Sequence, residues 1–278
     1  MPGASVPRPL LRIEGDTRRT SYDVVAAEEP LEIRVNGRAM AVTMRTPGHD
    51  FELAAGFLLT EGVVDRGDQV RAMRYCGPGP GPAPVDPLRE FNVVDVAVSD
   101  DAPAAGVAPR AVFTSSSCGL CGRASISSVR SRVPVDVAGD PLRLSVEVLA
   151  GLPDRLRAAQ AVFARTGGLH AAGLFDADGT LVCAREDVGR HNAFDKVIGW
   201  AAMHRRLPLR SHVLMASGRA SFELVQKALI AGAPALAAVS APSSLAVELA
   251  EEAGMTLVGF LRGDTMNVYA GGDRVVGA

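Results

Sequence analysis

The sequence predicts an α/β protein whose N-terminal part is α+β. In the second half, short apolar runs alternate with segments of helical period, an order typical of parallel strands joined by right-handed crossovers. The expected strands are 213–216, 235–239 and 257–261, and the expected helices are 222–231 and 245–253. The pattern changes within residues 115–142, which we interpret as a cysteine loop and linker between a small α+β domain (21–114) and a larger α/β domain (143–278).

The start of the small domain is predicted from turn chemistry. Residues 1–20 are rich in Pro and Arg, so we expect a frayed, flexible terminus. Residues 31–35 alternate between apolar and polar, and Asn36-Gly37 separates them from a second apolar run. This arrangement predicts a β-hairpin with a type I′ turn.

One helix and one further strand complete the small domain. Apolar residues recur at helical spacing over 51–59, with Asp50 as the expected N-cap and Gly62 as the expected end. Residues 77–87 are almost entirely Gly, Pro and Ala, a composition that favours a flexible connection. We interpret this segment as an insertion. Residues 91–99 predict the next strand.

The larger domain is expected to begin with a helix over 144–165. Ser145 is its expected N-cap, and Pro153 predicts a break or kink. Two short apolar runs around an Asp-Gly pair predict a hairpin over 174–182. Residues 191–204 predict an amphipathic helix.

Composition excludes several classes of protein. The net charge is −2 and aromatic residues make up 5%, which argues against bulk nucleic-acid binding and base-stacking platforms. No secretory signal and no membrane span are visible in the sequence, so we expect a cytoplasmic protein. Thiols stay reduced in the cytoplasm. The four cysteines are therefore expected to be reactive or to pack in the core, and not to form structural disulfides.

Two cysteines, Cys118 and Cys121, lie in a run of Ser and Gly that favours an exposed loop. They could be half of a zinc site, a dithiol redox motif, two loop cysteines without a role, or a nucleophilic pair that carries sulfur as a persulfide. Cys76 and Cys183 are single, so a four-ligand zinc site is not expected. The persulfide interpretation is favoured because an exposed thiolate can reach both a donor and an acceptor.

The densest polar run covers residues 185–196. It is either a solvated loop with an exposed helix face, or the lining of a polar pocket. In the second interpretation the lining residues are Asp187, Arg190, His191, Asn192 and Lys196.

Two corners follow strands of the predicted parallel sheet, where ligands bind in open α/β folds. The first is Ser217-Gly218-Arg219, in which backbone N–H groups and the guanidinium suit an anion. The second has the members Phe260, Leu261, Arg262, Gly263, Asp264 and Thr265. The alternative for both corners is ordinary turn chemistry. His170 alone is more often a satisfied core histidine than a ligand.

Taken together, these segments resemble the formate dehydrogenase accessory sulfurtransferase family (FdhD). The matching segments are Thr46–Leu58, Ser117–Gly122, Thr166–Ala172, Arg185–Lys196, Ser217–Arg219 and Gly259–Tyr269. They span the chain from about residue 30 to its end, and the Glu-Asp-Val-Gly-Arg-His-Asn run at 186–192 is the most specific of them.

The resemblance implies a role. Members take persulfide sulfur from a cysteine desulfurase and pass it to the molybdenum bis-guanine-dinucleotide cofactor, which then serves formate dehydrogenase. It implies that Cys118 is the carrier, that Cys121 assists, and that the stretch 260–265 is associated with the cofactor, for which GDP is an expected mimic. It also implies a cytidine-deaminase-like fold for the larger domain and a homodimer.

The same comparison argues against deaminase chemistry. Zinc deaminases carry His-x-Glu and Pro-Cys-x-x-Cys. Here His170 is followed by two alanines, and Ser217-Gly218-Arg219 stands where cysteine ligands are expected. No structural zinc is therefore expected. Two other functions stay open, a non-catalytic chaperone that delivers the cofactor and a Cys-x-x-Cys dithiol oxidoreductase.

Overall fold

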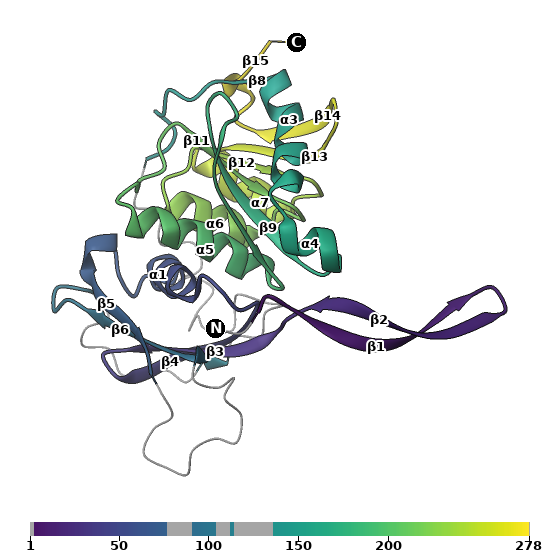
Figure 1. Cartoon of the computed structure of the whole chain (residues 1–278). Helices are drawn as coiled ribbons and strands as arrows, with labels where there is room; N and C mark the ends of the chain where they lie inside the picture. The colour runs from purple at the N-terminus through teal and green to yellow at the C-terminus, as the bar shows by residue number, and fades with distance from the viewer. Residues whose placement is uncertain (1–2, 77–90, 104–111, 114–135, 278) are drawn as a thin grey trace.

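Two sheets of different construction are joined through a pair of packed helices (Figure 1). The computed structural model describes residues 3–76, 91–103, 112–113 and 136–277. The linker 115–142 and the segment 77–87 lie mostly or wholly outside this range, so the predicted domain boundary stays a prediction. The expected α/β architecture with a smaller α+β N-terminal part is confirmed.

The smaller sheet has the strand order β5-β6-β3-β4-β7. Its strands are β3 (Glu29–Val35), β4 (Arg38–Arg45), β5 (Val70–Tyr75), β6 (Val93–Val98) and β7 (Val112–Phe113). The predicted hairpin is confirmed, because Val35 pairs with Arg38 across a two-residue turn. Asn36 and Gly37 both have positive φ, at 49° and 78°, as a type I′ turn requires.

Helix α1 (Asp50–Thr60) packs between this sheet and the larger domain (Figure 1). The predicted N-cap is wrong by one position. His49 occupies the cap with a left-handed φ of 58° and makes no side-chain cap hydrogen bond. The Asp50 carboxylate is instead held by the Arg45 guanidinium at 3.0 Å. Gly62 follows the helix with φ 70°, as expected for its end.

The larger sheet has the order β10-β9-β11-β12-β13-β14. The strands are β9 (His170–Asp176), β10 (Leu181–Asp187), β11 (His212–Ala216), β12 (Ala235–Ala238), β13 (Thr256–Arg262) and β14 (Thr265–Ala270). The three central strands β11, β12 and β13 are parallel, as predicted, and the predicted β9–β10 hairpin is present. The outer strands run antiparallel to their neighbours.

Helices cover both faces of this sheet (Figure 1). Alternate side chains of β11 pack on opposite faces of the sheet. Leu214 belongs to the core under α5, α6 and α7, while Val213 and Met215 belong to the core under α3. The helices are α3 (Val146–Ala158), α4 (Ala161–Thr166), α5 (Arg190–Met203), α6 (Phe222–Ile230) and α7 (Ser244–Glu252). Burial on both faces explains the continuous apolar runs of the strands. The pair β8 (Leu144–Ser145) and β15 (Val275–Val276) lies beside them.

The expected helix over 144–165 is two helices. Ser145 caps α3 by accepting a hydrogen bond from the Val148 N–H, as predicted. Pro153 lies inside α3, and the chain breaks later, at Ala159 and Gln160. The reason is a tightened last turn, in which the N–H groups of these two residues bond to carbonyls only three positions back.

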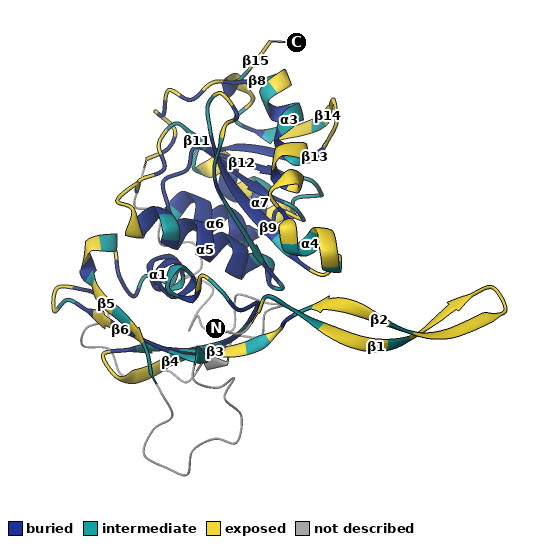
Figure 2. Ribbon diagram, viewed as in Figure 1, coloured by how far each residue is buried: buried dark blue, intermediate teal, exposed yellow. Residues whose placement is uncertain are grey.

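Helix α5 is buried on almost all sides, so the prediction of an amphipathic helix over residues 191–204 is wrong. The helix lies between α1 on one side and the sheet on the other, so its polar residues must find partners inside the protein (Figure 2). Asp195 does so by accepting hydrogen bonds from the Lys227 ammonium at 2.7 Å and the Thr60 hydroxyl at 2.9 Å.

The N-terminal segment is paired, which corrects the expectation of a frayed terminus. Strands β1 (Ser5–Glu14) and β2 (Thr17–Ala26) form an antiparallel ribbon that projects from the body and is mostly exposed (Figures 1 and 2). Prolines are tolerated in such a ribbon because each strand has an edge without a partner. The turn is permitted by Gly15, whose φ is 60°.

The most apolar stretch of the sequence, residues 228–250, forms the end of α6, β12 and most of α7 of the larger domain. Across the ranges that the structure describes, no helix combines the length and the apolar character needed to cross a membrane.

Helices α1 and α5 touch through glycines. A Cβ added at Gly56 would lie 1.9 Å from the carbonyl oxygen of Asp195, and one added at Gly199 would lie 1.8 Å from the carbonyl oxygen of Glu52. Real side chains do not tolerate such distances, so the two helix backbones are in direct contact here.

We expect Gly56→Ala to lower the free energy of unfolding by about 3 kcal/mol, because the methyl group forces the helices apart. The matched control is Gly151→Ala in the middle of α3, where the nearest atoms would be 3.5 Å away, in the Arg155 side chain. That control should be neutral or stabilising by up to about 1 kcal/mol. Urea unfolding of both variants is the measurement, and equal stability of the two would contradict the close contact.

Candidate functional site

The two corners predicted from the sequence lie together at the carboxyl ends of β11, β12 and β13. Ser240, which follows β12, joins them. Its N–H donates to the carbonyl of Gly218 at 3.2 Å, and its carbonyl accepts from the N–H of Phe260 at 3.2 Å. This edge of a parallel sheet is the usual place for a ligand in α/β proteins.

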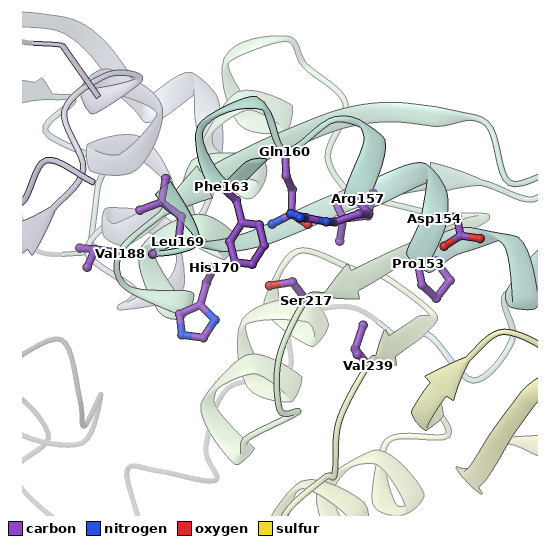
Figure 3. A pocket seen from close by; sticks show the side chains of 13 residues that line it. Pro153, Asp154, Arg157, Gln160, Phe163, Leu169, His170, Val188, Ser217 and Val239 are labelled. Atoms are coloured by element: carbon purple, nitrogen blue, oxygen red, sulfur yellow. The ribbon is translucent and has the colours of Figure 1, made fainter. Parts of the chain in front are cut away.

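A cavity of about 630 Å³ opens beside this edge (Figure 3). Ser217 and Val239 line it from the sheet, His170 from the start of β9, and the α3–α4 segment forms the opposite wall. The Ser217 hydroxyl oxygen accepts a hydrogen bond from the N–H of Ala171 at 2.8 Å, so its own proton can be donated to a ligand. The volume is within the range of small-molecule and cofactor sites.

Two guanidinium groups near the cavity lack an anionic partner among the residues that the structure describes. Neither Arg190 nor Arg219 makes a hydrogen bond or an ion pair within the described residues, and the Nε atom of Arg190 is buried. Both groups act on His170. Burial is the largest cause that lowers the pKa of His170, and Arg190, His191 and Arg219 lower it further. The imidazole is therefore neutral at neutral pH, and the unpaired positive charge favours an anion.

The corner after β13 is partly structural. Leu261 is fully buried in the core under α3, and the hydroxyl of Thr265 donates to the carbonyl of Arg262 at 3.0 Å, which closes the turn around Gly263. Phe260 remains 40% exposed and has a left-handed φ of 52°. Strained backbone of this kind is found preferentially at functional sites. Asp264 is exposed, and the Arg262 Nε–H reaches the carbonyl of Val239 at 3.4 Å, at the cavity wall.

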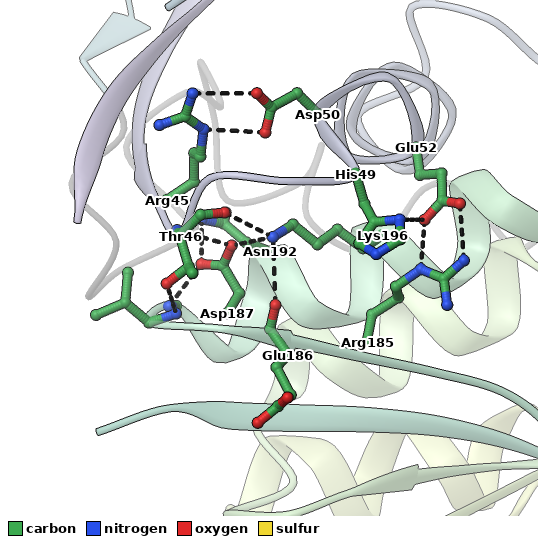
Figure 4. A network of polar contacts seen from close by, with 12 residues as sticks. Arg45, Thr46, His49, Asp50, Glu52, Arg185, Glu186, Asp187, Asn192 and Lys196 are labelled. Atoms are coloured by element: carbon green, nitrogen blue, oxygen red, sulfur yellow. Dashed lines mark hydrogen bonds and ion pairs between the residues drawn. The ribbon is translucent and has the colours of Figure 1, made fainter. Parts of the chain in front are cut away.

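Most of the polar run at 185–196 forms a buried network (Figure 4). The Lys196 ammonium lies 2.7 Å from the Asp187 carboxylate and donates to the carbonyls of Thr46 and Glu186. Asp187 also accepts from the N–H of Thr46 at 3.1 Å, and Asn192 donates to it at 3.0 Å. These groups are satisfied inside the protein, so they position the end of β10 and the start of α5.

His191 lies between the network and the cavity edge. Its Nε2 atom is 3.4 Å from the Ser221 hydroxyl and 3.8 Å from the Glu223 carboxylate, at the start of α6. The nearby His191 imidazole is the main reason that the pKa of Glu223 falls to about 2. Of the five predicted lining residues, Arg190 is the one whose charge is left without a partner among the described residues.

Sequence reasoning missed a second charged cluster. Arg45, fully buried, holds Asp50 through two hydrogen bonds of 3.0 Å, and Arg185 holds Glu52, which also pairs with His49 at 3.3 Å (Figure 4). The Arg185–Glu52 pair joins residues 133 positions apart, so no local sequence signal could have found it. The cavity wall formed by α3 and α4 was also missed, because its residues read as ordinary helix positions.

The thiols fall into two groups. Cys118 and Cys121 lie outside the described residues, so their predicted roles stay predictions. Cys183 is buried in the core, and burial raises the pKa of its thiol to about 11, which makes it unreactive. No group of three or more His, Cys, Asp or Glu side chains could hold a metal ion in the part of the chain that the structure describes. The expected absence of structural zinc is still a prediction.

Fold and site define an α/β protein with a cationic pocket at the carboxyl edge of three parallel strands. A model of the FdhD/NarQ family matches residues 26–276. The sulfur carrier protein FdhD of Streptomyces coelicolor is 56% identical over 270 residues, which are 96% of this chain and 94% of that protein. Its counterpart in Mycobacterium tuberculosis is 53% identical over 279 residues, 98% and 99% of the two chains. The chain belongs to the FdhD/NarQ family, as its motifs indicated.

A solved structure supports the fold. The crystal structure of a putative formate dehydrogenase accessory protein from Desulfotalea psychrophila superposes with a TM-score of 0.76 at 24% sequence identity. The match covers 98% of this chain and 100% of that one. The two-part architecture described above is therefore shared with that protein.

Glu52 should make stability depend on acid pH. Burial alone would raise the pKa of Glu52, but hydrogen bonds from Arg185 and His49 outweigh it and hold the pKa near 2, below its ordinary 4.5. A carboxyl with a depressed pKa stabilises the fold above pH 4.5 and loses that contribution as pH falls toward 2. Glu52→Gln should therefore lower the free energy of unfolding by about 2 kcal/mol near neutral pH.

The deficit of Glu52→Gln relative to the wild type should shrink as the pH is lowered to about 3, measured by urea unfolding at each pH. The control is Glu251→Gln on the exposed face of α7, which should stay within about 0.5 kcal/mol of wild type throughout. A deficit for Glu52→Gln that does not change with pH would contradict the assignment.

Proposed function

We propose that the chain is a sulfurtransferase that matures a formate dehydrogenase. It takes persulfide sulfur from a cysteine desulfurase onto Cys118 and transfers it to the molybdenum bis-guanine-dinucleotide cofactor. The observation that carries the proposal is a pair of guanidiniums, Arg190 and Arg219, that have no anionic partner among the described residues and lie near a cavity large enough for a nucleotide. The curated relatives named as sulfur carriers and the formate dehydrogenase accessory protein of similar fold support it.

The sulfur chemistry requires two thiols. The thiolate of Cys118 attacks the outer sulfur of the donor's persulfide, the donor's S–S bond breaks, and the donor keeps the electron pair as a thiolate. Release of this sulfur as hydrosulfide needs two electrons. Cys121 supplies them when its thiolate attacks the Cys118 sulfur and closes a disulfide. A cellular dithiol then reduces the disulfide.

The nucleotide end of the cofactor suits the cationic site. A diphosphate between Arg190 and Arg219 would neutralise two guanidiniums that have no counter-ion within the described ranges, and each could make charge-assisted hydrogen bonds. The Ser217 hydroxyl has a free proton for the same group, and Arg262 lies at the cavity wall. Asp187, Asn192 and Lys196 support this site indirectly, because they fix the start of α5, where Arg190 lies.

The partners follow from this assignment. We propose that a cysteine desulfurase donates the sulfur, that formate dehydrogenase accepts the loaded cofactor, and that the chain works as a homodimer. A chaperone that only binds the cofactor would use the same pocket but would need no nucleophile. The two functions therefore differ at Cys118.

Cys118 should carry the persulfide. After incubation with a cysteine desulfurase and free cysteine, intact mass spectrometry should show a gain of one sulfur atom in the wild type and none in Cys118→Ala. Cys183→Ala is the control and should keep the gain, because that thiol is buried with a raised pKa. A gain that persists in Cys118→Ala but is lost in Cys121→Ala would reverse the two roles, and no gain in the wild type would favour the chaperone.

GDP should bind, and Arg219→Ala and Arg190→Ala should each weaken binding by roughly 10- to 100-fold, the value of a charged hydrogen bond. Titration calorimetry is the measurement. Arg210→Ala is the matched control, since Arg210 is exposed and precedes β11, at the opposite end of the strand from the site. Binding that is equal in all three variants would contradict the proposed anion site.

A further inference from the structure

The last turn of α5 and the segment that follows it form a positively charged surface that the site described above does not use. Residues 204–212 include three arginines and two histidines but no Asp or Glu, in a protein whose net charge is −2. Arg205, Arg206 and Arg210 are exposed. None of the three guanidiniums makes a hydrogen bond or an ion pair with a residue that the structure describes, so their charge is not neutralised within that part of the chain.

Trp200, the only tryptophan of the chain, adds an aromatic surface beside these arginines. The His204 ring stacks on the indole with the ring centroids 4.7 Å apart, and the Arg206 guanidinium carbon lies 5.3 Å from the indole centroid. Met203, on the same face of α5 as the half-buried indole, is 45% exposed. Trp, Arg and Met are enriched at protein–protein interfaces. We call the set Trp200, Met203, His204, Arg205 and Arg206 the Trp200 patch.

Arg205 has a backbone conformation that glycine adopts more easily. Its φ is 55°, in the left-handed region, directly after the last cap residue of α5. The Arg205 N–H donates to the carbonyl of Ala202 at 3.1 Å, and the next N–H along the chain donates to the carbonyl of Ala201 at 2.8 Å, which closes the helix. Glycine is the common residue at such a position. An arginine there lowers stability relative to glycine, so its presence points to a role of the side chain.

The Trp200 patch and the cavity lie at opposite ends of α5. Arg190 is the first residue of this 14-residue helix, which is about 21 Å long. The short helix η1 (Gly67–Gln69), which packs against α5, carries Asp68, but that carboxylate is already paired with Arg66 at 3.1 Å. A molecule bound at the patch therefore leaves the cavity open and does not compete with Asp68 for the arginines of the patch.

An acidic protein segment fits this surface best. Guanidiniums bind carboxylates through paired hydrogen bonds, and clusters of them recognise acidic motifs. A nucleic acid fits less well, because the chain as a whole is negatively charged and only 5% of its residues are aromatic. An anionic membrane attracts larger clusters of Lys and Arg than this one.

We propose that the Trp200 patch is a docking site for an acidic segment of a protein partner. Arg205 and Arg206 bind its carboxylates, Trp200 packs against it, and Arg210 adds to the positive field. The proposal goes beyond the sulfur-transfer function and does not depend on it, since no residue of the patch lines the cavity.

The test is a fluorescence titration, because the single tryptophan reports on the patch itself. The probe is a synthetic peptide of alternating Glu and Ala, about ten residues long, and the matched control peptide has Gln in place of Glu. The acidic peptide should change the tryptophan fluorescence in a saturable way, and its affinity should fall as the NaCl concentration rises from about 20 mM to about 500 mM. The control peptide should not bind.

Arg206→Ala and Arg205→Gly should each weaken binding of the acidic peptide by roughly 3- to 5-fold, the value of an exposed charge pair. Arg205→Gly should at the same time raise the melting temperature, because glycine suits the left-handed backbone. Weaker binding in a more stable protein is not an effect of misfolding. Arg18→Ala, at an exposed position of β2, is the matched control and should bind the peptide like the wild type.

Equal binding of the two peptides, or wild-type affinity in both patch variants, would overturn the proposal. Displacement of the acidic peptide by GDP would place the peptide in the cavity and overturn it as well. An oligothymidylate that binds the patch more tightly than the peptide would assign the patch to nucleic acid instead. A lower molecular mass of Arg206→Ala than of the wild type in light scattering would assign it to a second copy of the chain. Absence of sulfur on Cys118 would count against the proposed function alone.

Discussion

The arrangement of the site depends on the buried ion pair between Asp187 and Lys196. Both side chains are almost fully excluded from water, a costly situation that is stable only when the remaining hydrogen-bonding positions are filled. They are filled by Asn192, by the backbone on either side of the pair, and by the backbone of Thr46, which follows the last residue of β4 in the other sheet. One ion pair therefore fixes the end of β10, the first turn of α5 and the connection between the two sheets.

This internal pairing also explains the charge of the pocket. Two acidic groups near the cavity are paired inside the protein, Asp187 of the polar run with Lys196 and Glu223 of α6 with His191, whereas the guanidiniums of Arg190 and Arg219 have no such partner among the described residues. The imidazole of His170 is kept neutral by burial and by these same cations. These acidic groups are paired away from the cavity, so the two guanidiniums that lie near it favour an anionic ligand.

The sequence predicted those parts of the fold that local physics controls. Three features could be predicted because they depend on only a few neighbouring residues. These are the Asn36-Gly37 turn, the helix cap at Ser145 and the hydrophobic pattern of the parallel core strands. The ribbon was missed because prolines usually argue against strands, and the burial of α5 was missed because it depends on α1, far away in sequence. The two corners were predicted separately, and only the sheet order brings Ser217 and Phe260 together.

The contact between Gly56 and Gly199 has a mechanical consequence. No side chain lies between the two helix backbones at this contact, so nothing there can change rotamer to absorb a shift of one helix. Close-packed interfaces transmit strain, and this contact therefore couples the two sheets mechanically. A displacement of the small sheet is passed to the larger sheet through α1 and α5, so a partner that binds either sheet moves both.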